Sequence, residues 1–301
     1  MSIAMRIPSP AVGPLVREHP VAEASVRRRP SRWRKLGWTG TGALVFLPLL
    51  VILATAGPQL WTWTAFDQHM DALLQEPSVA HPLGTDEFGR DMLARLLLGA
   101  RWSLAGAAVI CAGTSLLGFL IAALATSGGR KTDAIVGRVI EAMMSLPGLV
   151  TALAFAAILG ASFGNLLLAL VVTSWPWYAR TYRALLLKER CALYVESAVA
   201  AGAGRWRVLL RHTLPNIIGP AAVLATANFG SVILNLAGLS FLGLGMQPPT
   251  PEWGEMINEG ARYFQDYPWQ MIAPGVCIAA TVLAVNLLGD ALRDVADPRT
   301  R

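Results

Sequence analysis

Long stretches without a charged side chain are the feature that most constrains how this chain can fold. Asp, Glu, Lys and Arg are absent from Trp38 to Gly57, and again between Glu141 and Arg180. About 20 apolar residues suffice for an α-helix to cross the hydrocarbon core of a bilayer. The 301 residues are 54% hydrophobic and only 15% charged, whereas soluble domains are about one quarter charged. The sequence therefore predicts an all-α polytopic membrane protein.

Six apolar segments, separated by polar or glycine-containing turns, predict six transmembrane helices. They cover residues 38–57, 102–127, 135–159, 166–182, 216–239 and 271–289. Ala54-Thr55-Ala56 resembles a signal-peptidase site, but the apolar stretch is longer than the ~7–15 residues usual in a signal peptide. We therefore expect the first segment to be an uncleaved anchor. Pro147 is expected to kink or break the third helix, because proline removes a backbone hydrogen bond.

The polar segments divide the chain into four parts. We expect a basic flexible cytoplasmic tail at 1–37 and the first transmembrane helix with an extracytoplasmic segment at 38–101. The main transmembrane domain is expected at 102–290, and a cytoplasmic C-terminus at 291–301. Arginines cluster in the tail, where membrane lipids with anionic headgroups would attract them.

Basic residues lie mostly on one predicted side of the membrane. Of the 25 Lys and Arg residues, 21 fall in the tail, the turn after the second helix, the loop after the fourth helix and the C-terminus. Cytoplasmic loops carry such an excess, so the pattern predicts that both termini are cytoplasmic. The distribution also explains the net charge of +6 without nucleic acid as a partner.

Few polar residues fall within the predicted helices. Glu141 is an ionisable group in the third helix, and we expect it to pair with Arg138, three residues earlier. Asn228 and Asn235 lie on nearby turns of the fifth helix. Such amides either bond to a neighbouring helix, which is the commoner case, or line a polar path.

The sequence contains no pattern typical of a metal, cofactor or nucleotide site. Its three cysteines are far apart, and its four histidines form no cluster with ligand spacing. The turn from Ser127 to Thr132 lacks the spacing of a phosphate-binding loop. We therefore predict no metal, no cofactor and no ATP site in this chain.

A polar, arginine-bearing segment, residues 194–216, separates the fourth and fifth predicted helices. It begins with a short alanine-rich helix, which Gly202 is expected to end. A second amphipathic stretch follows, whose apolar residues are Trp206, Leu209 and Leu210. Leu214-Pro215 then starts the next helix. A helix–glycine–helix of this kind on a membrane face indicates a surface presented to a partner, and a solvated loop is the alternative.

This polar segment resembles the EAA loop of bacterial ABC-importer permeases, which docks on a cytoplasmic ATPase subunit. We call residues 183–215 the EAA-like loop. The residues that the resemblance implies for coupling to the ATPase are Glu196, Ser197, Ala198, Gly202, Leu214 and Pro215. Ser197 stands where the family usually has alanine, which is a small change.

Two further motifs resemble the C-type permease subunit of dipeptide, oligopeptide and nickel ABC importers. The extracytoplasmic signature consists of Gly84, Thr85, Asp86, Gly89, Arg90 and Asp91. The Pro-rich loop before the last helix contains Gln247, Pro248, Pro249, Trp253 and Gly254. From the residues alone, we expect Thr85 or Asp86 to cap a helix that begins near Glu87. Three arginines would then lie at the membrane interface, namely Arg90, Arg95 and Arg101.

The resemblance implies a type I (MetI-like) ABC importer permease fold with six transmembrane helices in the bacterial inner membrane. It implies a non-catalytic subunit that moves dipeptides, longer peptides, glutathione or nickel chelates inward by alternating access. The implied partners are a homologous B-type permease subunit, two ABC ATPase subunits and an extracytoplasmic substrate-binding protein.

Two other classes of function compete with this interpretation. A self-contained secondary transporter or channel would be expected to carry paired intramembrane charges or inverted repeats with broken helices. A membrane-embedded hydrolase is a weaker alternative, because Gly238-Leu239-Ser240-Phe241-Leu242 misses the second glycine of the GxSxG motif.

Overall fold

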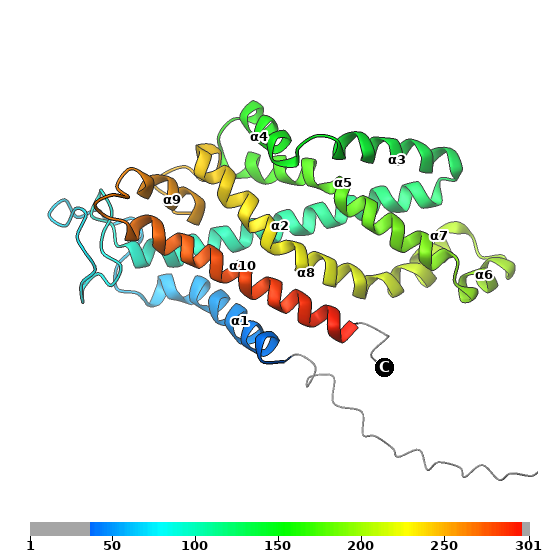
Figure 1. Cartoon of the computed structure of the whole chain (residues 1–301), viewed down its shortest axis with the longest axis horizontal. Coiled ribbons are helices and arrows are strands. Elements are labelled where there is room, and N and C mark those ends of the chain that lie inside the picture. Colours follow the sequence, from blue (N-terminus) through cyan, green and yellow to red (C-terminus); the bar gives the residue numbers. More distant parts are fainter. Residues whose placement is uncertain (1–36, 297–301) are drawn as a thin grey trace, which may run out of the picture. The chain divides into compact units, whose positions relative to one another are not determined.

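The computed structural model describes residues 37–296, which form a bundle of α-helices (Figure 1). The helices are α1 (Gly37–Leu60), α2 (Met92–Ser127), α3 (Arg130–Met144), α4 (Gly148–Leu159), α5 (Phe163–Arg190), α6 (Leu193–Ala200), α7 (Arg205–Arg207), α8 (Leu214–Leu239), α9 (Trp253–Ala261) and α10 (Trp269–Ala296). Two π-helical segments, Val208–Thr213 and Ser240–Leu244, adjoin the ends of α8. No β-strand occurs in the described part of the chain, and the all-α prediction is confirmed.

The long helix α2 has 36 residues and packs against α1, α5 and α8. The last helix, α10, packs against α1, α8 and α9. Small residues allow close contacts: a Cβ atom added to Gly118 on α2 would lie 2.6 Å from the Cβ of Tyr178 on α5. Helices in lipid associate through such van der Waals packing, because lipid offers little hydrophobic driving force.

Four helical stretches within residues 37–296 are long and apolar enough to cross a membrane. They are Gly40–Leu60, Met92–Ser127, Arg205–Leu244 and Trp269–Asp294. The bent pair α3–α4 would make a fifth. The remaining predicted span, 166–182, lies within the 28-residue helix α5. Because α5 has polar residues near its middle and basic residues at its end, its mean hydropathy is too low for it to count among the candidate spans. Length and hydropathy therefore reproduce only part of the six-span prediction.

Pro147 divides the predicted third span into two helices. α3 ends at Met144 and α4 begins at Gly148, and the two helices are bent by 87° relative to each other. Proline lacks the N–H that the helix needs, and its ring clashes with the preceding turn. The predicted break is therefore confirmed, and the two helices together form a bent pair that covers the predicted third span, 135–159.

The predicted ion pair between Arg138 and Glu141 is not formed. Asp133, earlier on α3, instead pairs with Arg183 on α5, whose Nε and Nη2 donate to the two carboxylate oxygens at 2.6 Å each. A guanidinium binds a carboxylate through two parallel hydrogen bonds, which a loose pair along one helix cannot provide.

The prediction that an asparagine amide bonds one helix to another is confirmed for Asn228 on α8. Its Nδ2 donates to the hydroxyl of Tyr178 on α5 at 3.0 Å.

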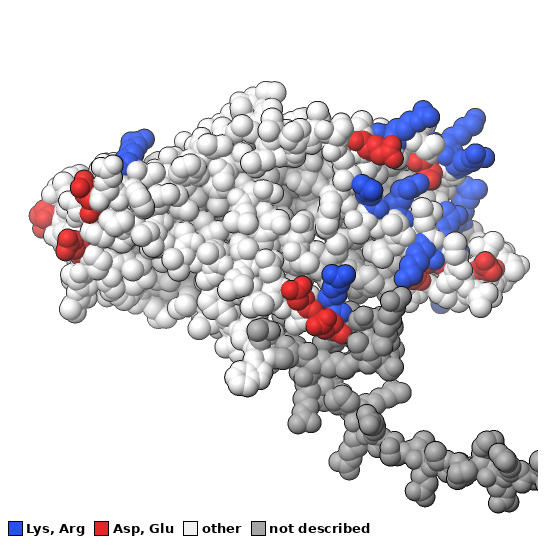
Figure 2. Space-filling view, in the orientation of Figure 1, with Lys and Arg blue, Asp and Glu red and all other residues white. Residues whose placement is uncertain are grey.

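Charged side chains gather at the two ends of the bundle. Lys and Arg lie mainly at the end that carries α6 and α7, while the opposite end shows mostly Asp and Glu (Figure 2). Between the ends, the visible surface is almost free of charge (Figure 2). The predictions for the tail before residue 37 and for the chain after residue 296 lie outside the described residues.

Candidate functional site

The EAA-like loop folds into the predicted helix–glycine–helix. α6 ends at Ala200, and Gly202 has a φ of +85°, a left-handed conformation that glycine adopts at little cost. The turn is closed by hydrogen bonds from the Gly202 N–H to the Val199 carbonyl and from the Ala203 N–H to the Ala198 carbonyl, at 2.9 and 3.0 Å. The chain then passes through α7 and the π-helical segment into α8, with proline in its first turn as predicted.

The apolar side chains of the loop divide between an inner and an outer face. Val195, Val208 and Leu209 are buried. Trp206 and Leu210, the other apolar residues of the amphipathic stretch, are instead 57% and 58% exposed. Two more large apolar side chains in the loop, Leu193 and Val199, are 80% and 57% exposed. Exposed apolar groups of this kind on a polar surface are typical of a site that binds another protein.

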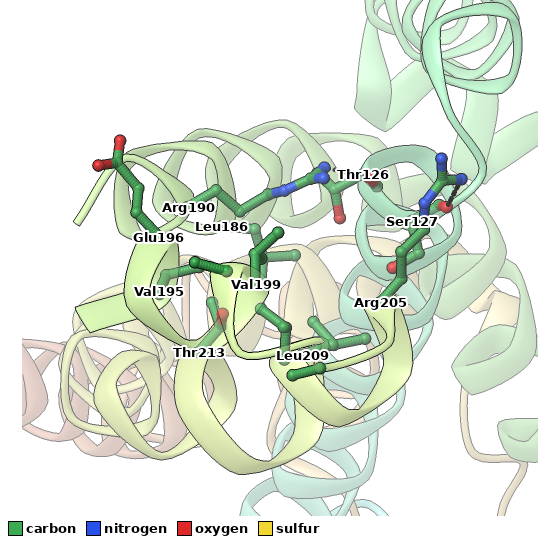
Figure 3. A pocket seen from close by; sticks show the side chains of 13 residues that line it. Thr126, Ser127, Leu186, Arg190, Val195, Glu196, Val199, Arg205, Leu209 and Thr213 are labelled. Atoms are coloured by element: carbon green, nitrogen blue, oxygen red, sulfur yellow. Dashed lines mark hydrogen bonds between the residues drawn. The ribbon is translucent and has the colours of Figure 1, made fainter. Parts of the chain in front are cut away.

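A cavity of 480 Å³ lies behind this outer face, between the loop and the ends of α2 and α5 (Figure 3). Val195, Val199 and Leu209 form part of its apolar wall. The Glu196 carboxylate points away from the cavity, toward the outside of the loop (Figure 3). Among the predicted coupling residues, Glu196 is therefore free to meet a partner.

Two arginines tie the loop to the C-terminal end of α2. Arg190 donates to the carbonyl of Thr126, and Arg205 Nη1 donates to the carbonyl of Ser127 at 3.2 Å (Figure 3). The last carbonyl groups of a helix lack partners within the helix, and cations at this end also complement the helix dipole. The loop is thus joined directly to α2 by these two hydrogen bonds.

The extracytoplasmic signature forms a tight turn, and the predicted helix start near Glu87 is wrong. α2 begins at Met92, and its cap is Asp91, whose Oδ1 accepts from the Ala94 N–H at 2.7 Å. The Oδ1 of Asp86 is already occupied, because the N–H groups of Phe88 and Arg90 both donate to it at 2.9 Å.

Glycine is required at two positions of this turn. Gly84 and Gly89 both have a φ of +72°. A Cβ atom on Gly89 would lie 1.9 Å from the carbonyl oxygen of His69, and one on Gly84 would lie 2.3 Å from that of Gln75. The signature glycines therefore allow the preceding segment to cross the turn at close range.

Arg90 and Arg95, both predicted to lie at the membrane interface, are buried within the protein. Arg90 Nε donates to Asp86 Oδ2 at 2.6 Å, and Arg95 forms an ion pair with Glu259 on α9. The side chains of both arginines and of Asp86 are at most 3% exposed. Charges this deeply buried require partners. Of the three predicted interface arginines, only Arg101 is exposed.

The Pro-rich loop and α9 complete the same cluster. Trp253 is fully buried and its Nε1 donates to the Leu96 carbonyl at 3.1 Å. Glu252 caps α9, accepts from the Ser103 hydroxyl at 2.6 Å and so joins α9 to α2. A Cβ atom on Gly254 would lie 2.5 Å from the carbonyl oxygen of Ala237. The structure thus brings the extracytoplasmic signature and the Pro-rich loop together.

Sequence reasoning missed the acidic members of this cluster. Glu252 could have been found, because an oxygen-bearing side chain just before Trp253-Gly254 fits a helix cap. Glu259 carries no comparable signal in the sequence.

Burial changes the pKa of two other carboxyl groups in this region. It raises the pKa of Glu255, on the same helix as Glu259, from 4.5 to about 7, and it also raises the pKa of Glu87.

These features define a multi-pass helical membrane protein with a folded cluster at one end and a loop with exposed apolar side chains at the other. Residues 114–301 match the family described as binding-protein-dependent transport system inner membrane component. The chain belongs to this family of membrane transport components.

Relatives of similar length share more than a third of their residues with this chain. The dipeptide transport system permease protein DppC of Alkalihalophilus pseudofirmus is 35% identical, over 86% of this chain and 85% of the relative. The di/tripeptide transport system permease protein DppC of Pseudomonas aeruginosa is 39% identical, over 86% and 88%. The glutathione transport system permease protein GsiD of Pectobacterium atrosepticum is 37% identical, over 94% and 95%.

The fold is similar to that of a solved ABC transporter. An inward-facing structure of the MetNI methionine ABC transporter matches with a TM-score of 0.56 and 20% identity, over 68% of this chain and 98% of that chain. This likeness concerns the fold alone, and it confirms the predicted MetI-like permease fold.

Proposed function

We propose that this chain is the non-catalytic permease subunit of an ATP-driven importer of dipeptides or related small peptides. Its partners in this proposal are a second, homologous permease, two ATPase subunits and an external binding protein. The names of the relatives, which include dipeptide, di/tripeptide and glutathione transport permeases, support a peptide substrate.

The observation that carries the proposal is the exposed apolar side of the EAA-like loop. Leu193, Trp206 and Leu210 are each more than half exposed, although contact with water does not favour apolar side chains. An ATPase subunit that covers these side chains would bury them. Its movement on ATP binding would reach α2 through Arg190 and Arg205 and open the pathway alternately to the two sides of the membrane.

The orientation of the chain in the membrane that we propose rests on the distribution of its basic residues. Lys and Arg gather at the end of the bundle that carries the EAA-like loop (Figure 2). Under the positive-inside rule this end faces the cytoplasm, where ATP is available. The extracytoplasmic signature and the Pro-rich loop then face the external binding protein.

Crosslinking combined with uptake tests the proposal. A Leu193→Cys variant that also carries Cys191→Ser should crosslink to a co-expressed ATPase subunit through a short bis-maleimide. Ile158→Cys in the same background is the control, because Ile158 is 84% exposed on α4 and lies outside the loop. Uptake of peptide without ATP hydrolysis, or no difference between the two variants, would favour a self-contained transporter.

A further inference from the structure

A second hollow lies beside the helix break at Pro147. It has a volume of 310 Å³ and is bordered by α4, α5, α8 and the end of α3. Its lining residues are Met143, Met144, Leu146, Gly148, Leu149, Ala152, Leu170, Thr173, Ser174, Pro176, Trp177, Asn228 and Asn235. The α5 members fall near the middle of that 28-residue helix, so the hollow lies at the depth of the uncharged band seen in Figure 2.

Several polar groups in this hollow have no partner within the described chain. The side-chain amide of Asn235, the hydroxyl of Ser174 and the indole N–H of Trp177 make no hydrogen bond there. Asn228 uses its NH₂ to bind Tyr178, which leaves its carbonyl oxygen available. Unsatisfied polar groups in the hydrocarbon region cost several kcal/mol each. Asn235 and Trp177 are exposed on this chain and Ser174 is half-buried, so water or a ligand can reach these groups and satisfy them.

The available groups match the chemistry of a peptide bond. A backbone amide offers one N–H donor and one C=O acceptor, and an asparagine side chain can satisfy both. No side chain that lines the hollow is charged, so the lining matches the backbone rather than any charged terminus or side chain. Met143 and Met144 add flexible apolar contacts that can adapt to different side chains.

We propose that Ser174, Trp177, Asn228 and Asn235 form a binding surface for the backbone amides of a peptide during its passage through the membrane. This inference rests on the proposed function and deepens it, with the second permease closing the open side of the hollow. Because the surface carries no charge, it accepts peptides with little regard to their side chains, and selection is left to the external binding protein.

Asn235→Leu tests this surface in the complete importer reconstituted in proteoliposomes. Radiolabelled alanylalanine, delivered by the binding protein, is the probe. We expect uptake per ATP hydrolysed to fall about tenfold, the scale of one polar group left unsatisfied, while the ATP hydrolysis rate stays within about twofold. Asn235→Gln keeps the amide and should retain uptake. Thr226→Val, which removes a polar group from the opposite face of α8, is the matched control and should also retain it.

A change of specificity separates binding from a purely structural role. Asn235→Asp places one negative charge in the hollow, and a charge acts strongly where water is scarce. The ratio of alanyl-lysine to alanyl-glutamate uptake should then rise about fivefold over that of the original protein. An unchanged ratio together with normal uptake by Asn235→Leu would overturn the inference. Absence of ATP-dependent uptake of all three dipeptides by the original protein would instead overturn the proposed function, and the inference with it.

Discussion

Arg183 on α5 and Asp133 on α3 are joined by two hydrogen bonds of 2.6 Å. Arg183 is the first residue of the EAA-like loop, and α3 leads from Asp133 to the break at Pro147. The pair therefore links the loop that would meet an ATPase to α3, whose last residues line the hollow beside Pro147.

Exchange of the two charges should show whether this link transmits force. Asp133→Arg and Arg183→Asp should each lower ATP-coupled uptake several-fold, because like charges would then face each other. The double variant restores an opposite pair and should recover most of the uptake. Both side chains are about one third exposed, so the effect on stability should be below about 1 kcal/mol. Uptake and thermal unfolding of the same preparations would be compared, and loss of uptake in the double variant would contradict the link.

The left-handed turn at Gly202 should be essential for coupling. Gly202→Val is expected to distort the turn, since a β-branched residue strongly disfavours a φ of +85°. A new Cβ there would touch nothing within 4 Å, so the effect comes from the backbone and not from a clash. Gly204→Val is the control, because Gly204 also has open space but a φ of −67°. We expect uptake to be lost only in Gly202→Val, with both variants inserted in the membrane.

Accessibility of Cys191 should report the orientation of the chain. Cys191 is exposed, whereas Cys111 is buried and Cys277 is half-buried. A membrane-impermeant maleimide should label inside-out vesicles at Cys191 and leave intact spheroplasts unlabelled. Cys191→Ser should abolish the signal. Labelling of intact spheroplasts at this residue would contradict a cytoplasmic EAA-like loop.

Removal of the charge at Glu259 should destabilise the protein. Its carboxylate pairs with Arg95 and also lies 3.5 Å from Arg90, and both arginines are buried. Glu259→Gln leaves their positive charge only partly compensated, which we expect to cost about 3 kcal/mol. Thermal unfolding of the purified protein in detergent would measure this loss. Equal stability of the variant would show that water screens the cluster.

Glu255→Gln, one turn earlier on α9, should have the opposite effect. The pKa of Glu255 is raised from 4.5 to about 7, so the folded protein keeps a proton that the unfolded chain releases. Stability should therefore fall as the pH rises from about 4.5 to 7 and stay level above that range. The variant removes this penalty and should be more stable at pH 8 by about 3 kcal/mol, with no advantage below pH 4.5. A stability difference that does not change with pH would contradict the assignment.

Features that depend on a residue itself could be predicted from the sequence. Pro147 marks a helix break and Gly202 a helix end, because proline lacks an N–H and glycine lacks a Cβ. The same rule does not hold at every proline, since Pro176 lies inside the continuous helix α5. The start of α2 was harder, because Asp86 and Asp91 are both good caps. The structure decides between them through the turn at Gly89, which directs two N–H groups onto Asp86.

Contacts between distant segments could not be predicted from spacing. Arg95 and Glu259 are 164 positions apart, and each looks like an ordinary interface charge in the sequence. The same limit applies to the EAA-like loop. The amphipathic pattern groups Trp206 with Leu209, but in the structure Leu209 is buried and Trp206 is exposed. The motif resemblance located these sites, and only the packing shows which side chains are exposed.

Helical backbone, α-helical and π-helical in turn, runs from Arg205 to Leu242 and ends at Gly243, whose φ is +81°. At 1.5 Å per residue such a stretch is about 60 Å long. One end lies in the EAA-like loop and the other reaches the Pro-rich loop, so a tilt of about 5° at the first displaces the second by about 5 Å, from that length. Under the proposed function, a small movement of the ATPase subunit at the EAA-like loop would thus cause a larger displacement at the end of the helix near the Pro-rich loop.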